Sequence, residues 1–225
     1  MVRRTVDVSR PVLERNESLA DANRRRFRAA GLFVVNVLSS PGSGKTALLE
    51  RTLADLSADL PCGVVVGDLA TDNDARRLTA GGGRAVQITT GDVCHLDAAM
   101  VAQAVDRLGT EGLRVLFIEN VGNLVCPGSY DLGEGARAVL LSVTEGEDKP
   151  LKYPAMFKSA DVVIVTKTDI AGAVGYDRAA ALANIQGVAP QAAVMELSAR
   201  TGAGVSAWYD YLRTGSGARG PDDAR

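Results

Sequence analysis

The sequence lacks a long apolar stretch, and no run of hydrophobic residues approaches the roughly 20 that a membrane-spanning helix needs. Residues 1–18 begin with basic side chains but contain no apolar core segment and no small-residue cleavage site, so no signal peptide is predicted. A net charge of −2 and a pI near 5.5 provide no basic footprint for nucleic acid. We therefore expect a cytoplasmic protein that binds neither membranes nor nucleic acid.

Cysteine and histidine are also scarce, because the chain has three cysteines and one histidine. An odd cysteine count without close, even spacing excludes a disulfide framework and is typical of a reducing compartment. Cysteines in such a compartment are buried, catalytic or bound to metal. Cys62 begins an apolar segment and is predicted to pack in the core, which leaves Cys94, His95 and Cys126 for chemistry.

Apolar segments rich in β-branched residues alternate with amphipathic segments along the 225-residue chain, which is long enough for one large α/β domain. This alternation predicts a mostly parallel sheet with helices on both faces. Strands are expected at 32–38, 62–68, 84–89, 114–120, 136–144, 161–167 and 192–197, and helices at 12–29, 46–60, 74–80, 98–108, 177–184 and 203–213. We divide the chain into an amino-terminal helical extension (1–30), the α/β domain (31–213) and a small polar tail (214–225) that is expected to be disordered.

The first predicted strand is followed by SSPGSGKT (39–46), which ends like the Walker A phosphate motif but has Ser39 in place of its first glycine. A glycine-rich turn from a strand to a helix lets backbone N–H groups converge on a phosphate, which the helix dipole also favours. The alternative is an ordinary strand-to-helix turn. We predict a P-loop NTPase fold in which Lys45 contacts the β- and γ-phosphates and Thr46 binds Mg²⁺. The loop residues predicted to bind nucleotide are Gly42, Ser43, Gly44, Lys45, Thr46 and Ala47.

Acidic residues close two of the predicted strands at the same edge of the sheet. Glu119 ends an apolar strand, as a Walker B carboxylate does, and Gly122 follows close enough to bring its N–H to a γ-phosphate. Asp68 ends another strand, where it can bind Mg²⁺ or orient the attacking water, and the polar segment 68–74 is a candidate switch. The alternative is that each carboxylate only caps a loop or helix. The predicted catalytic residues are Lys45, Asp68 and Glu119, with Thr46, Asp68 and Glu119 at magnesium.

A further predicted strand ends in TKTD (166–169), which resembles the guanine-reading Asn-Lys-x-Asp motif of GTPases. A carboxylate at Asp169 accepts hydrogen bonds from guanine N1–H and N2–H₂, whereas adenine lacks the exocyclic amine. The motif resemblance implies that Lys167 packs over the base, and that Ser198 and Ala199 are the second base-contacting element. Thr166 replaces the usual asparagine, which loses an amide that braces the loop. A strand-end turn with exposed charges is the alternative.

Two loops near this edge carry the remaining cysteines and the histidine. Cys94 and His95 precede a predicted helix, whose amino terminus is expected to lower the pKa of the thiol and favour the metal-binding thiolate. Cys126 follows Glu119 by seven residues, which connects it to the segment predicted to sense the γ-phosphate. Thiolate and imidazole ligands select Ni²⁺, Cu or Zn²⁺, and such sites need four ligands. A two-fold dimer sharing Cys94 and Cys126 reaches four, whereas the alternative is inert buried thiols.

These motifs together resemble the HypB family of hydrogenase nickel-incorporation GTPases. SSPGSGKT, GDLATDNDA, CHLDA, FIENVGNLVCP, SVTEGEDKPLKYP and TKTD occur in the order and spacing of that family across about residues 15–213. Cys-Pro-Gly at 126–128 differs from the Cys-Pro-His of the related urease nickel GTPase. The resemblance implies that Cys94, His95 and Cys126 bind nickel or zinc at the interface of a homodimer that depends on nucleotide and metal.

The same resemblance implies the activity and the partners. Slow hydrolysis of GTP to GDP is expected to gate nickel transfer to the [NiFe]-hydrogenase large subunit, with a HypA-type nickel chaperone as partner. The sequence has neither the amino-terminal cysteine cluster nor the histidine-rich stretch of some members, so tight nickel binding and storage are expected to be absent or supplied by a partner. The alternatives are a small-molecule P-loop kinase and a metal-binding module with a vestigial nucleotide site.

Overall fold

The computed structural model describes residues 9–68, 73–80, 83–91 and 93–217. Its centre is a seven-stranded parallel sheet with the strand order β3-β2-β4-β1-β5-β6-β7. The strands are β1 (Phe33–Ser39), β2 (Cys62–Asp68), β3 (Arg84–Thr89), β4 (Val115–Glu119), β5 (Ala136–Ser142), β6 (Val162–Thr166) and β7 (Ala193–Glu196). This arrangement confirms the predicted α/β fold with a parallel sheet.

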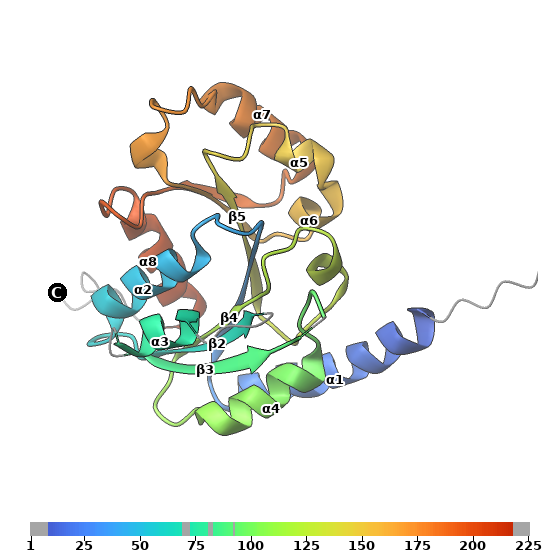
Figure 1. Ribbon diagram of the computed structural model, residues 1–225. Helices are drawn as coiled ribbons and strands as arrows, with labels where there is room; N and C mark the ends of the chain where they lie inside the picture. Colours follow the sequence, from blue (N-terminus) through green and yellow to red (C-terminus); the bar gives the residue numbers. More distant parts are fainter. Residues whose placement is uncertain (1–8, 69–72, 81–82, 92, 218–225) are drawn as a thin grey trace, which may run out of the picture.

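Helices cover both faces of the sheet, as Figure 1 shows. One face packs against α2, α3 and α8, whereas α1 and α4 cover half of the other face and α6 and α7 cover the rest. The helices are α1 (Ser9–Ala29), α2 (Lys45–Leu56), α3 (Asn73–Ala80), α4 (Ala98–Leu108), α5 (Lys149–Lys152), α6 (Pro154–Lys158), α7 (Arg178–Val188) and α8 (Val205–Gly215), with short 3₁₀ helices η1 (Cys126–Ser129) and η2 (Thr168–Ile170). Among the described helices, none has the length and apolarity to cross a bilayer.

The apolar strands are buried on both faces because every second side chain points to the same side. In β1, Val35 and Val37 pack toward α2 and α8, whereas Val34 and Leu38 pack toward the opposite helices. Asn36 shares the second face and is fully buried, which is unusual in such a strand. The carboxyl ends of all seven strands meet at one edge of the sheet, so the loops that follow them are brought together there.

Most predicted elements are confirmed, with differences at their ends. The helix predicted at 46–60 ends at Leu56, since the ring of Pro61 would clash with the carbonyl four residues before it in a continued helix. Helix α8 continues to Gly215, two residues beyond the predicted domain boundary at 213, and residues 218–225 of the predicted tail lie outside the described residues. The short helices α5 and α6 were not predicted, because four or five residues are too few to show a helical period.

Helix α1 is tied to the α/β domain by two buried asparagines. The Asn16 side chain accepts a hydrogen bond from Ala98 N (2.9 Å) and donates one to Asp131 O (2.8 Å). The Asn23 amide donates to Ala98 O (2.8 Å) and Leu132 O (3.1 Å). These bonds fix the amino terminus of α4 and the loop before β5 to the same helix. The amino-terminal extension is therefore part of the packed structure rather than an appendage.

We expect Asn23→Ala to lower the free energy of unfolding by about 1–3 kcal/mol, because two buried carbonyl oxygens lose their donor. Arg25→Ala is the matched control, since Arg25 is exposed on the same helix and surface changes of this kind usually stay within about 0.5 kcal/mol. Urea-induced unfolding followed by far-UV circular dichroism measures both. Equal stability of the two variants would contradict a structural role for the asparagine.

Candidate functional site

The loop between β1 and α2 has the backbone conformation of an anion-binding turn. Gly42 and Gly44 have φ of 76° and 97°, in the left-handed region that glycine adopts without steric cost. Gly44 is also the N-cap of α2 and carries no side chain, so the first N–H groups of the helix stay available to a ligand. Those groups and the helix dipole together favour a bound phosphate.

Lys45 lies at the start of α2 and is almost completely buried. Its ammonium donates a hydrogen bond to Ser39 Oγ at 3.1 Å, so the residue that departs from the Walker A pattern is an acceptor for the lysine. Burial lowers the pKa of Lys45, and nearby Glu119 partly opposes that shift. A buried cation with one neutral partner is a strong electrostatic site for an anion.

Glu119 ends β4 beside this loop, where the Thr46 hydroxyl donates to its Oε1 at 2.6 Å. Burial raises the pKa of Glu119 to about 7, although the Thr46 hydrogen bond and the Lys45 charge oppose the shift. Within the described part of the chain, the buried Oε2 atom of Glu119 has no hydrogen-bond partner. A buried carboxylate oxygen without a partner, next to a hydroxyl, is a donor set that fits Mg²⁺.

These groups line one cavity of about 410 Å³ at the carboxyl edge of the sheet, which we call the phosphate-loop cavity. Its lining residues are Pro41, Gly42, Gly44, Lys45, Thr46, Ala47, Gly67, Asp68, Asp74, Arg77, Glu119, Asn120, Val121 and Gly122. A Cβ atom at Gly122 would lie 2.9 Å from Pro41 Cα, so only glycine fits against the loop at this position. Residues 69–72, the centre of the predicted switch, lie outside the described residues.

Two charged contacts of this loop were not predicted from the sequence. Arg77 reaches the cavity from α3 and donates to Glu50 at 2.6 Å and 3.0 Å, which links α3 to α2. Ser43 donates a hydrogen bond to Glu145, a carboxylate from the loop after β5. Arg77 lies in no quoted motif, and Glu145 lies within SVTEGEDKPLKYP. The sequence did not indicate either contact, because each joins segments far apart in the chain.

A second cavity, of about 280 Å³, lies on the other side of Gly44. Its lining brings together every residue predicted for the base site, and it comprises Gly44, Ala47, Leu48, Thr166, Lys167, Asp169, Ile170, Ser198, Ala199 and Arg200. The Lys167 backbone has φ of 60°, and its ammonium donates to Gly42 O at 2.7 Å. Left-handed backbone at a residue other than glycine is concentrated at functional sites.

Thr166 still anchors the loop, although the sequence suggested that this contact was lost with the usual asparagine. Its hydroxyl donates to Ser43 O at 2.7 Å, so the strand that precedes the predicted base site is fixed to the phosphate loop. The Asp169 side chain is 14% exposed and lies 3.7 Å from the guanidinium of Arg200, whose side chain is 84% exposed. The carboxylate of Asp169 is therefore held at the cavity by a solvent-exposed partner that a ligand can displace.

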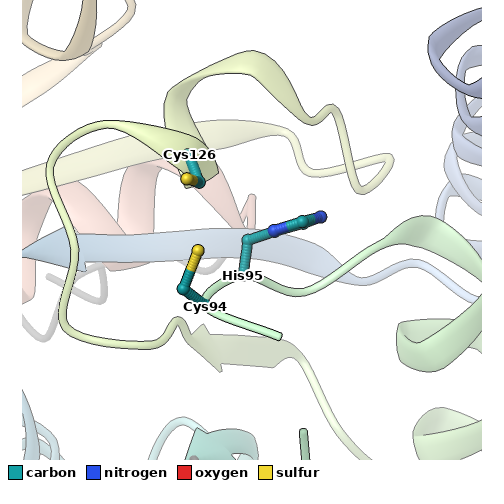
Figure 2. A group of neighbouring side chains, drawn as sticks. All are labelled: Cys94, His95 and Cys126. Carbon is teal, nitrogen blue, oxygen red and sulfur yellow. The ribbon is translucent and has the colours of Figure 1, made fainter. Parts of the chain in front are cut away.

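Cys94, His95 and Cys126 form one cluster, in which the ligand atoms lie within 4.8 Å of one another. Figure 2 shows the two sulfur atoms facing each other across the gap between their loops, with the His95 ring beside them. Asn123 donates to Cys94 O at 3.3 Å, which holds the two loops together. All three side chains are partly exposed, so this thiol–imidazole cluster opens toward solvent and is not inert core.

The expected lowering of the Cys94 pKa is wrong. The pKa of Cys94 is raised, first by its hydrogen bond with the Cys126 thiol and then by burial. The side chain of Asp97 caps the amino terminus of α4 by accepting from Met100 N at 2.8 Å, so that N–H group has a carboxylate partner and not the Cys94 sulfur. Cys62, by contrast, packs in the core as predicted, where burial raises its pKa to about 12.

Tyr130 is the neighbour of the cluster that the sequence did not reveal. Its ring stacks on His95 with 4.0 Å between centroids and 28° between planes. Burial lowers the pKa of His95, which keeps the imidazole neutral, and neutral imidazole is the form that binds metal. Among the described residues, none hydrogen-bonds to the buried Nδ1 atom of His95.

Comparison with known proteins places this chain among nucleotide-binding proteins. Residues 33–196 match the family model described as "CobW/HypB/UreG, nucleotide-binding domain". The hydrogenase maturation factor HypB of Rhizobium leguminosarum bv. viciae is 49% identical over 216 residues, which cover 96% of this chain and 72% of that protein.

Solved structures give the same result. The crystal structure of HypB from Helicobacter pylori in complex with nickel superposes with a TM-score of 0.86 and 43% identity, covering 90% of this chain and 95% of that one. The crystal structure of the hydrogenase maturation factor HypB from Archaeoglobus fulgidus gives a TM-score of 0.84 and 39% identity, covering 89% and 98%.

The raised pKa of Glu119 predicts a pH dependence of stability. The folded state favours the protonated carboxyl, so this stabilisation is complete below the usual pKa of 4.5 and is lost as pH rises through about 7. We expect the free energy of unfolding to fall less between pH 5 and pH 8 in Glu119→Gln than in the parent, by an amount on the order of 3 kcal/mol at most. Urea unfolding at both pH values, without metal or nucleotide, measures this difference. Identical pH profiles would contradict the assignment to Glu119.

Proposed function

The chain belongs to the CobW/HypB/UreG family as a HypB-type protein, and on that premise we propose that it hydrolyses GTP to gate nickel insertion during hydrogenase maturation. The observation that carries this proposal is the pairing of the phosphate-loop cavity with the thiol–imidazole cluster. The two are joined by the short segment 119–126, which begins at Glu119 and ends at Cys126.

In this proposal the triphosphate lies along the turn before α2. The N–H groups of the turn and the ammonium of Lys45 hold the β- and γ-phosphates, and the Thr46 hydroxyl and Glu119 carboxylate hold Mg²⁺, with Asp68 close to it. Bound Mg²⁺ would neutralise phosphate charge in the transition state. Asp68 ends β2 and lines the cavity, which supports the proposal that it orients the attacking water.

The guanine base is proposed to occupy the second cavity. Asp169 accepts hydrogen bonds from the two guanine N–H groups, after Arg200 has moved aside. Lys167 packs its aliphatic stem over the base while its ammonium stays on Gly42 O, and Ser198 and Ala199 close the opposite side. This arrangement supports GTP over ATP, because adenine offers no partner for the second carboxylate oxygen.

Nickel is the cargo, and the thiol–imidazole cluster is proposed to hold it. Two thiolates and one imidazole suit Ni²⁺ or Zn²⁺ better than Mg²⁺. One chain supplies three ligands and such sites use four, so a homodimer that shares the cluster completes the coordination. The relatives are hydrogenase maturation factors, which supports a hydrogenase as the acceptor. We propose its large subunit as the acceptor and a HypA-type chaperone as a partner.

In this proposal the nucleotide controls nickel affinity through segment 119–126, which joins the two sites. GTP binding fixes the end of β4 and closes the dimer, and loss of the γ-phosphate on hydrolysis releases the segment that leads to Cys126. Nickel affinity therefore differs between the GTP and GDP states, by a factor that is usually 5 to 150 for such coupling and is reciprocal.

We expect Asp169→Asn to weaken GTP binding by about 10²- to 10⁴-fold, because an amide cannot accept both guanine hydrogen bonds and presents a donor to one of them. The same variant should bind xanthosine triphosphate more tightly than the parent does, since xanthine has a carbonyl where guanine has its amine. Equilibrium binding of fluorescent analogues of both nucleotides measures this exchange. Unchanged GTP affinity would overturn the base site.

We expect the nickel affinity of the parent to differ at least five-fold between the GDP-bound protein and the protein with a non-hydrolysable GTP analogue. Cys126→Ala should lose most nickel binding in both states, because one of two thiolates is removed from each cluster. Titration of Ni²⁺, followed by the thiolate-to-nickel charge-transfer absorption, measures the nickel affinity of the parent and of Cys126→Ala in each nucleotide state.

Cys62→Ala is the matched control for Cys126→Ala, since it removes a thiol that is buried in the core. It should leave nickel affinity unchanged. Equal nickel affinity in the two nucleotide states of the parent would overturn the gating, and full nickel binding by Cys126→Ala would overturn the metal site.

A further inference from the structure

A chain of buried polar side chains runs from the end of β4 to the loop that carries Cys126. It lies on the face of the sheet that is covered by α1, α4, α6 and α7, and it separates the two apolar clusters of that face. Its members Asn36, Asn120 and Glu134 are each at most 8% exposed. Asn120 also lies in the lining of the phosphate-loop cavity, whereas Asn36 and Glu134 belong neither to that lining nor to the thiol–imidazole cluster.

This row of hydrogen-bonded side chains begins at Asn120, one residue beyond Glu119. Successive residues face opposite sides of the sheet, so Glu119 faces the phosphate loop while Asn120 faces the other side. The Asn120 amide donates to Asn36 Oδ1 at 3.2 Å, and its own oxygen accepts from Val121 N at 3.0 Å. A displacement of the end of β4 therefore moves both groups at once.

Asn36 lies on the neighbouring strand β1 and forms the next hydrogen bond of the row. Its amide donates to Glu134 Oε1 at 3.2 Å. Glu134 is a nearly buried carboxylate that also accepts from Leu132 N at 2.7 Å and from Arg137 Nε at 2.7 Å. Each oxygen of this carboxylate thus has a donor, as a buried charge requires.

Arg137 connects the carboxylate to the metal loop. Its other two nitrogens donate to Gly128 O at 3.1 Å and to Tyr130 O at 2.9 Å. Gly128 is two residues from Cys126, and Tyr130 stacks on His95. The guanidinium therefore holds the backbone next to Cys126 and the backbone of Tyr130, whose ring stacks on His95.

We propose that Asn36, Glu134 and Arg137 are positioning residues that couple the nucleotide state at Glu119 to the geometry of the thiol–imidazole cluster; this rests on the proposed function. The hydrogen bonds from Asn120 to Glu134 join buried groups, and those of Arg137 are partly buried. A shift at the Asn120 end therefore leaves a buried polar atom unpaired unless the neighbouring groups shift with it. Coupling between sites travels through contiguous contacts of this kind.

The test is the ratio of nickel dissociation constants in the GDP state and the GTP-analogue state. Asn36→Leu replaces the amide with an apolar side chain of similar shape and removes the central hydrogen bonds between Asn120 and Glu134. We expect the parent ratio, roughly 5 to 150, to fall to within about two-fold of one. Nickel binding in the GDP state and nucleotide binding should each stay within a few-fold of the parent, because no ligand to either is removed.

Thr52→Val is the matched control, since Thr52 is fully buried on the opposite face and its hydroxyl accepts from Trp208 Nε1 at 3.0 Å. It removes a buried hydroxyl outside the row of hydrogen-bonded side chains, so this variant should be less stable but keep the parent ratio.

Arg137→Lys is a second test variant, and it leaves the apolar core unchanged. Lysine keeps the charge opposite Glu134 but lacks the planar fork that reaches both carbonyls, so the ratio should again fall.

The outcomes separate this inference from the proposed function. A parent ratio of one overturns the gating and this coupling with it. A parent ratio above about five that persists in Asn36→Leu, or in Arg137→Lys where the first variant fails to fold, overturns the coupling alone. A ratio that falls equally in Thr52→Val also overturns it, because general destabilisation would then explain the loss.

Discussion

The position of β4 between β2 and β1 is the constraint on which both sites depend. Glu119 lies opposite Val37 of β1 and Val66 of β2, so pairing on both sides fixes the end of this strand. The turn after β1 and the segment after β4 consequently start from adjacent points. The hydrogen bond from Thr46 to Glu119 spans that junction. A change in the contents of the phosphate-loop cavity therefore acts at the root of the segment that leads to Cys126.

Burial makes this junction electrostatically unfavourable in the absence of ligands. The pKa of Lys45 is lowered and that of Glu119 is raised for the same reason, since each loses hydration that the other replaces only in part. Phosphate oxygens at Lys45 and a divalent cation at Glu119 would compensate both. Ligands that bind only the folded state stabilise it by mass action, so the chain gains stability from the molecules it is proposed to bind.

The sequence was sufficient for the fold because short apolar runs alternate with amphipathic segments, and this alternation is typical of a parallel sheet covered by helices. It also anticipated which residues converge, since the carboxyl ends of parallel strands meet at one edge. The pKa of Cys94 was predicted in the wrong direction because its hydrogen bond with the Cys126 thiol, which joins loops 32 residues apart in the sequence, raises it. Tyr130 and Asn36 were missed for a similar reason. Their contacts join segments far apart in the chain, and no periodicity or motif records such a contact.

The proposed homodimer, in which two copies complete one metal site, imposes a requirement on the loops that carry the ligands. Three donors from one chain must be held in place before a second copy supplies the rest, because disordered loops would lose conformational entropy on binding and weaken the metal. The Tyr130 stack on His95, the Asn123 bond to Cys94 and the Arg137 bonds to the backbone after Cys126 supply that order within one chain. In the proposed function, nickel and GTP favour the same closed dimer, so each would strengthen the binding of the other by an equal factor.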